Sequence, residues 1–216
     1  MKIAYVYSSS HEILKDYFFL GTMCEQWELI EKKSEEYSTG DHLSSGWSKI
    51  VKEKIKTYIE VIKNNTDEIV VFSDVDITWF KPVQEIIKQC LTQKDIVFQK
   101  ENLHNEEVNT GFIAVRCNKT VQNFFQDIFD NTVDNDQTTA NNLIKTNKIK
   151  CNYGFLPVNF LNDNLFSCHK KDILLYHSIC TKPKDGKTSL QIKYEKLLKM
   201  RNFVLDTKNI FLGQKS

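Results

Sequence analysis

The chain has 216 residues, with 29 lysine and arginine residues against 28 aspartate and glutamate residues. This length suits one α/β domain over residues 1–216, and the balanced charge gives no reason to expect a nucleic-acid partner. No apolar run is long enough to span a bilayer, and the six cysteines form no Cys-x-x-Cys pair, which indicates reduced thiols. We therefore expect a soluble, cytoplasmic protein without a membrane span.

The first predicted unit is a strand followed by a helix. Residues 2–7 are mostly apolar and predict a strand, and the spacing of Ser9 and Glu12 fits a capping box that opens a helix. The turn between strand and helix is expected at the ligand edge of the sheet, where helix N-termini attract anions. Tyr7, Ser8 and Ser9 are therefore candidate nucleotide contacts, with helix capping alone as the alternative for the serines.

The rest of the chain continues this alternation of strands and helices. Helical spacing predicts helices over residues 48–63, 83–91, 121–129, 134–145 and 189–200. Apolar runs predict strands over residues 27–30, 69–73, 95–99, 112–115, 151–156 and 173–176, and residues 31–47 form a polar loop suited to covering a site. The alternation favours a single α/β domain with a mainly parallel central sheet flanked by helices.

Two aspartates follow the most apolar of the predicted strands, residues 69–73. In a continuing strand, Asp74 and Asp76 would point to the same face and converge on one ligand. Trp79 and Phe80 keep the following chain apolar, so the two acids repel each other in a setting poor in water. A divalent cation with a phosphate behind it compensates such a pair. A solvated turn is the alternative, and the apolar neighbours weaken it.

Three segments together resemble a known family. Phe72-Ser73-Asp74-Val75-Asp76, Asn109-Thr110-Gly111-Phe112 and Asp136-Gln137 occur in the order and approximate spacing of nucleotide-diphospho-sugar transferases with the Rossmann-like GT-A fold. Within these enzymes the chain looks most like the retaining glycosyltransferases of the group numbered seventy-seven. The resemblance extends over about residues 2–180. Short domains of this kind also occur among the glycosyltransferases of large DNA viruses.

The resemblance implies a metal site that holds Mn²⁺ or Mg²⁺. Asp74 and Asp76 are its expected acidic ligands, and His177 is the expected third ligand because Tyr176-His177 follows a late apolar strand. Imidazole is an acceptable ligand for Mn²⁺. The glycine that the family has after this histidine is missing here, where Ser178-Ile179-Cys180-Thr181 stands instead.

The resemblance also implies nucleotide contacts by Ser73 and Asp74 and two lysines near the diphosphate. Lys182, in a Lys-Pro pair after the histidine, is expected to meet the diphosphate as a point charge. Lys54, on the helix before the central strand, is expected near the same group. Lys56 is an alternative to Lys54, and a solvated helical lysine without a role is another.

On the sugar side, the resemblance assigns Asn109, Thr110 and Gly111 to the donor sugar and the acceptor. The glycine also allows the backbone to approach a ligand closely, although a plain turn explains it equally. Asp136 and Gln137 are the expected catalytic residues facing the donor sugar. Asp136 then orients the sugar, stabilises positive charge at the anomeric carbon, or acts as a nucleophile, and an acid at a helix start also serves as a plain cap.

The sequence thus predicts a metal-dependent glycosyltransferase that moves a sugar from a UDP-sugar to a glycan or glycoprotein hydroxyl, with retention. The rival interpretation is a haloacid-dehalogenase-like phosphatase with Asp74 as its phosphorylated nucleophile. That class needs a late acidic pair after a strand, where this chain has His177 and Leu156-Pro157. A catalytically silent module that binds nucleotide sugars is the third interpretation.

Overall fold

Two sheets organise the chain in the computed structural model, which describes residues 1–35, 46–165, 168–179 and 181–205. The larger sheet has the strand order β2-β1-β3-β6-β5-β7, and the smaller has the order β4-β9-β8. The strands are β1 (Lys2–Tyr7), β2 (Glu28–Lys33), β3 (Ile69–Ser73), β4 (Ile77–Trp79), β5 (Ile96–Lys100), β6 (Val108–Arg116), β7 (Tyr153–Phe155), β8 (Phe160–Asn162) and β9 (Leu175–His177). The α-helices are α1 (Glu12–Leu14), α2 (Trp47–Asn64), α3 (Gln84–Cys90), α4 (Lys119–Asn131), α5 (Asp136–Lys145) and α6 (Ser189–Leu205). Short 3₁₀ and π segments are η1 (Ser9–His11), η2 (Lys15–Leu20) and η3 (Lys170–Asp172).

The large sheet is mainly parallel, as the alternation of strands and helices predicts. Strand β1 pairs in parallel with β2 and β3, and β5 pairs in parallel with β7. Strand β6 is the exception and lies antiparallel between β3 and β5. Its direction follows from the short connection over residues 101–107, because a parallel return needs a crossover of a dozen or more residues.

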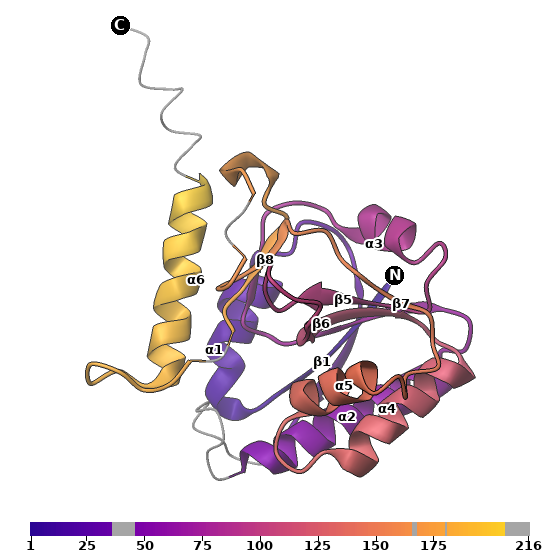
Figure 1. The fold of residues 1–216 in the computed structure, drawn as a ribbon. Helices are drawn as coiled ribbons and strands as arrows, with labels where there is room; N and C mark the ends of the chain where they lie inside the picture. The colour runs from indigo at the N-terminus through magenta and orange to yellow at the C-terminus, as the bar shows by residue number, and fades with distance from the viewer. Residues whose placement is uncertain (36–45, 166–167, 180, 206–216) are drawn as a thin grey trace, which may run out of the picture.

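Alternating side chains of β1 show how the two faces of the large sheet are covered. Ala4 and Val6 belong to the buried cluster that contains apolar side chains of α2, α4 and α5. Ile3 and Tyr5 belong to a second cluster, on the other face, that includes Ile87 of α3. In Figure 1, α2, α4 and α5 lie together below the sheet and α3 lies above it. The central sheet is therefore buried on both faces, which explains its nearly continuous apolar strands.

Helix α6 stands apart from these layers and packs through a third apolar cluster. Its Leu197 and Met200 join Leu14 and Phe18 of the first helical segment and Leu161 of β8. Figure 1 shows α6 in yellow beside α1 and the small sheet. No helix in the described ranges combines the length and apolar character that crossing a bilayer requires.

Several predicted boundaries differ from the structure. The strand predicted at 112–115 begins at Val108, so Asn109-Thr110-Gly111 lies within β6 and not in a turn before it. The capping box is also wrong, because the first 3₁₀ turn is preceded by Ser8, which makes no side-chain capping bond. Strands β4 and β8 were not predicted, since three residues are too few to show a period. Residues 31–33 of the predicted loop at 31–47 belong to β2, and most of the remaining residues of that loop lie outside the described ranges.

Candidate active site

Asp74 and Asp76 lie where the chain passes from the large sheet to the small one. Strand β3 ends at Ser73, and the backbone N–H of Asp74 donates to the carbonyl of Gly111 in β6 over 2.7 Å. Two residues later, the N–H of Ser178 donates to the carbonyl of Asp76 over 2.9 Å. The two acids therefore converge because each is tied to a different sheet. The predicted continuing strand, which would place both on one face, is absent at these residues.

The two carboxylates and His177 bring three ligand atoms within 4.8 Å of one another. His177 Nε2 lies 3.3 Å from Asp76 Oδ1 and 3.9 Å from Asp74 Oδ2. Asp76 Oδ1 is fully buried and has no hydrogen-bond partner among the described residues. A buried carboxylate oxygen without a partner is costly unless a further group satisfies it. Two carboxylates and an imidazole suit Mn²⁺ or Mg²⁺, so these residues fit the expected ion.

Gln99 fixes the ring of His177 from behind. Its amide nitrogen donates to the carbonyls of Phe160 and Leu161 over 3.0 and 2.9 Å, which leaves its Oε1 facing His177 Nδ1 at 2.9 Å. Because Oε1 only accepts, Nδ1 carries a proton and Nε2 turns its lone pair toward the acids when the ring is neutral. Burial by itself would lower the pKa of His177, but Asp76 raises it above its usual value. A metal ion at this site would therefore compete with a proton at Nε2.

Gly111 of β6 is required by the space that the side chains of His177 and Asp74 occupy. A Cβ at this position would lie 2.2 Å from His177 Cε1 and 2.7 Å from Asp74 Oδ2. Such distances are far inside van der Waals contact, so any larger residue must displace the strand or the two ligands. The close approach of backbone to a site explains this glycine better than the plain turn does.

We expect Gly111→Ala to lower the affinity for Mn²⁺ by at least about tenfold, because overpacking that costs about 1–3 kcal/mol would act on two ligands. Isothermal titration calorimetry measures this affinity in the wild type and in the variant. The matched control is Gly154→Ala in β7, where the nearest atoms to an added Cβ belong to the flexible side chain of Lys94, with Cε at 3.3 Å. Equal Mn²⁺ affinity in the two variants would contradict the assignment of Gly111.

Lys54 of α2 lies between Asp74 and Asp136 and contacts both carboxylates. Its Nζ lies 2.9 Å from Asp74 Oδ1 and 3.3 Å from Asp136 Oδ2, and it donates to the carbonyl of Thr110 over 3.3 Å. Burial by itself would lower the pKa of Lys54, but Asp136 and Asp74 raise it well above its usual value. The ammonium therefore stays charged. Lys56, the alternative considered for this position, is exposed.

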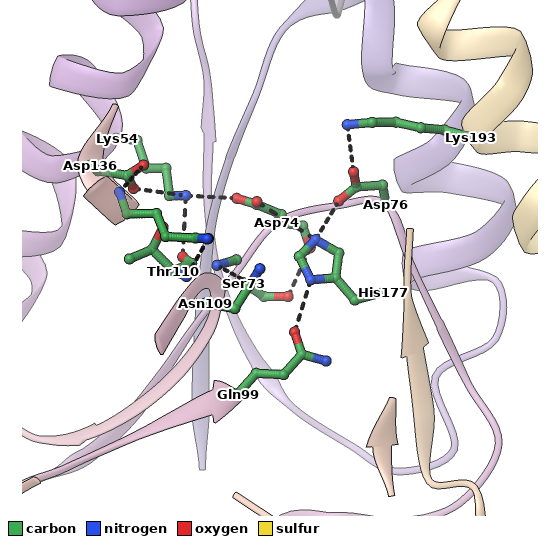
Figure 2. A network of polar contacts seen from close by, with 12 residues as sticks. Lys54, Ser73, Asp74, Asp76, Gln99, Asn109, Thr110, Asp136, His177 and Lys193 are labelled. Carbon is green, nitrogen blue, oxygen red and sulfur yellow. Dashed lines mark hydrogen bonds and ion pairs between the residues drawn. The ribbon is translucent and has the colours of Figure 1, made fainter. Parts of the chain in front are cut away.

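Two further side chains in this region were not predicted from the sequence. Lys193 of α6 lies with its Nζ 2.7 Å from Asp76 Oδ2, so the two acids stand between Lys54 on one side and Lys193 on the other (Figure 2). Burial opposes ionisation of Asp76, but Lys193 and His177 hold the pKa of its carboxyl well below its usual range. His11 faces the same region, and burial lowers its pKa to about 4, with Lys193 acting in the same direction.

The sugar-side candidates are held by one unpredicted acid, Glu101. Its Oε2 accepts from the amide groups of Asn109 and Gln137 over 2.6 and 3.1 Å. Asn109 Oδ1 accepts from the N–H of Gly111 over 2.8 Å, and Gln137 Oε1 lies 3.4 Å from the N–H of Thr110. These bonds link the start of β6 to the start of α5. The role of Glu101 as a shared acceptor depends on contacts between distant segments, which no local pattern in the sequence shows.

One cavity of about 970 Å³, including its open mouth, gathers most of the predicted site residues. Those that line it are Tyr7, Ser8, Lys54, Asp74, Asp76, Asn109, Thr110, Gly111, Asp136, Gln137 and His177. Three predicted residues do not line it. Ser73 is buried below, with its hydroxyl donating to the carbonyl of Asp74 over 2.8 Å, and Ser9 and Lys182 are exposed.

Comparison with known proteins shows which family and which solved structures the chain resembles. The sequence profile of the nucleotide-diphospho-sugar transferases matches residues 15–196, which is most of the chain. No curated protein sequence matches the chain significantly. Among solved structures, the fold is similar to the glycosyltransferase GlyE of Streptococcus pneumoniae TIGR4, with a TM-score of 0.60 and 12% identity. That alignment covers 95% of this chain and 63% of the GlyE chain, so the chain spans less than two thirds of that protein.

Two other solved glycosyltransferases align over nearly their whole length. One is a glycosyltransferase involved in the glycosylation of the major capsid of PBCV-1, with a TM-score of 0.57 and 16% identity over 93% of this chain and 100% of that chain. The other is the galactosyltransferase LgtC, solved with donor and acceptor sugar analogues, with a TM-score of 0.56 and 7% identity over 94% of this chain and 95% of that chain. At these identities the likeness concerns the fold, which is the GT-A fold.

Proposed function

This chain belongs to the nucleotide-diphospho-sugar transferase family, and we propose that it is a metal-dependent glycosyltransferase with a UDP-sugar donor. In this proposal it moves the sugar to a hydroxyl of a glycan or glycoprotein and retains the configuration at the anomeric carbon. The observation that carries the proposal is the cluster of Asp74, Asp76 and His177 in the cavity. The glycosyltransferases of similar fold support it, and donor, acceptor and stereochemistry rest on the sequence resemblance.

Asp74, Asp76 and His177 would hold the ion, Mn²⁺ or Mg²⁺, whose positive charge stabilises a leaving diphosphate. The protein's own contribution is to fix these ligands before the substrate arrives. Gln99 orients the ring of His177 over 2.9 Å, and Lys54 holds Asp74 over 2.9 Å. Ligands that are already oriented need little rearrangement when charge develops on the diphosphate.

The far wall of the cavity is suited to a sugar and its acceptor. Asn109, Thr110 and Gln137 present amide, hydroxyl and backbone groups beside Asp136. These polar groups match sugar hydroxyls, and the apolar Val6, Ile50 and Val51 nearby limit access of water. Limiting water matters because hydrolysis of the donor competes with transfer to an acceptor hydroxyl.

A screen of nucleotide sugars, with and without Mn²⁺, tests this function. We expect Mn²⁺-dependent release of a nucleoside diphosphate and, with a suitable glycan, transfer of the sugar, and both should stop when the metal is removed with a chelator. Release of phosphate from phosphomonoesters would instead support the phosphatase interpretation. Tight binding of a nucleotide sugar without any turnover would support the silent binding module.

A further inference from the structure

Lys193 reaches the cavity from a helix that carries none of the predicted site residues. Helix α6 is fixed at its first residue, where Ser189 and Thr181 exchange two hydrogen bonds of 2.8 and 3.2 Å. Leu197 and Met200 are buried further along the helix. The side chain of Lys193 is only 10% exposed and ends 2.7 Å from Asp76 Oδ2. A well-packed helix therefore holds the ammonium of Lys193 beside Asp76.

The two oxygens of Asp76 face different partners. Oδ2 pairs with Lys193, while Oδ1 lies 3.3 Å from His177 Nε2 and lacks a hydrogen-bond partner within the described ranges. Oδ1 is thus directed toward the other two ligands, and Lys193 touches Asp76 from the opposite side. A cation on Oδ2 leaves Oδ1 available to a metal ion. It also places a positive charge within a few ångströms of whatever anion the metal ion holds.

We propose that Lys193, rather than Lys182, is the lysine that meets the diphosphate of the donor, so that helix α6 forms part of the donor site. This inference rests on the proposed function. Two lysines of the described chain line the cavity, Lys54 and Lys193. Lys54 lies between Asp74 and Asp136, on the sugar side of the cluster, whereas Lys193 lies against Asp76. Lys182 is exposed and does not line the cavity.

The flexible four-carbon stem of lysine makes this role physically reasonable. A diphosphate held by a metal ion at Asp76 would lie close to Lys193 Nζ, which could reach a phosphate oxygen by rotation of its terminal bonds. Before the diphosphate arrives, the same charge opposes the approach of a divalent cation. Lys193 therefore disfavours binding of the metal ion alone and favours binding of the metal ion together with a diphosphate.

The opposite signs of these two effects define the experiment. Calorimetry measures binding of Mn²⁺ alone, and then binding of micromolar inorganic pyrophosphate to the protein with Mn²⁺. We expect Lys193→Gln, which keeps an N–H donor for Asp76, to bind pyrophosphate roughly tenfold to a hundredfold more weakly, the value of a charged hydrogen bond. Its affinity for Mn²⁺ alone should be equal to or higher than that of the wild type. Inorganic pyrophosphate is the probe because it does not depend on which base or sugar the donor carries.

Matched variants make the result decisive. Lys199→Gln, at an exposed position of the same helix, should match the wild type in both measurements, and Lys193→Arg should restore most of the pyrophosphate affinity. A parallel loss of Mn²⁺ and pyrophosphate affinity in folded Lys193→Gln would show a purely structural role and overturn the inference. A larger pyrophosphate loss in Lys182→Gln than in Lys193→Gln would overturn it as well. Absence of Mn²⁺ binding by the wild type would instead refute the proposed function itself.

Discussion

Replacing Asp76 by asparagine is expected to lower the affinity for Mn²⁺ by more than about a hundredfold, since loss of even outer-shell partners costs roughly 10- to 100-fold. The asparagine keeps the shape of the side chain but removes the charge. One of the two carboxylate oxygens is replaced by an amide nitrogen, which cannot ligate a cation. Because the amide oxygen is the terminal atom that can accept from Lys193, the NH₂ group takes the place of Oδ1, the buried oxygen without a hydrogen-bond partner in the described chain. The best-placed ligand is therefore lost. The affinity for Mn²⁺, measured by calorimetry, and the rate of donor cleavage should fall together.

The substitution also leaves Lys193 buried without its carboxylate, 2.7 Å from a neutral amide. Breaking a buried ion pair from one side costs about 3–5 kcal/mol, so the thermal midpoint should fall too. The double variant Asp76→Asn/Lys193→Met also removes the lysine charge, so it should recover part of this stability without recovering Mn²⁺ binding. That separation shows that the metal effect is not a consequence of unfolding.

Asp163→Asn is the matched control for Asp76→Asn. Asp163 also pairs with a lysine of α6, Lys196, over 2.9 Å, but it does not line the cavity. This variant should lose some stability and bind Mn²⁺ as the wild type does. If Asp76→Asn and Asp163→Asn showed the same Mn²⁺ affinity, Asp76 would have no place in a metal site.

The parts of the fold that the sequence predicted are those with a strong local pattern. The central strand is predictable because its apolar run at 69–73 is bounded by a polar turn on one side and two acids on the other. Helix α2 is predictable because its apolar residues recur at helical spacing from Val51 to Ile62. Three-residue strands such as β8 have no such pattern, and their existence depends on pairing with β9. The direction of β6 was not predictable, because the predicted strand began only at residue 112, and the structure alone shows that seven residues separate β5 from β6.

Among the site residues, too, those with a local sequence pattern were predictable and those that depend on tertiary contacts were not. Asp74 and Asp76 follow an apolar strand and His177 ends one, so their place at the ends of strands was predictable before the structure. Lys193 is one of several lysines in an amphipathic helix, and only the docking of α6 against the third apolar cluster distinguishes it from Lys199. Gln99 acquires its role from the carbonyls of β8, 61 and 62 residues away in the chain. Roles of this kind are set by tertiary contacts and leave no local trace.

Asp136 is held in a way that favours an orienting role over a nucleophilic one. Its Oδ1 accepts from the backbone N–H of Gln137 over 3.0 Å, and its Oδ2 lies 3.3 Å from the ammonium of Lys54. Asn135, and not Asp136, supplies the helix cap by accepting from the N–H of Thr138 over 3.1 Å. These contacts engage both oxygens and fix the direction of the carboxylate, which suits a group that orients the sugar better than one that must turn to attack the anomeric carbon.

We therefore expect Asp136→Asn to reduce sugar transfer by about a hundredfold, the usual cost of misplacing a substrate by an ångström. Added azide should not restore the rate. A nucleophile replaced in the same way should lose at least about 10⁴-fold, as nucleophile knockouts do, and azide should rescue it by forming a glycosyl azide. Asp134→Asn, at an exposed acid two residues earlier, is the control and should transfer sugar as the wild type does.

The stereochemistry of the product completes this test. If Asp136 orients the sugar, the acceptor attacks from the face of the leaving diphosphate, which itself helps to accept the proton, and the anomeric configuration is retained without a covalent intermediate. NMR of the product from the wild type and from Asp136→Asn should then show the same retained configuration, with only the rate changed. Azide rescue would assign Asp136 as the nucleophile of a double displacement. An inverted anomeric carbon in the wild-type product would exclude retention by either route, because one displacement would then have occurred at the face opposite the diphosphate.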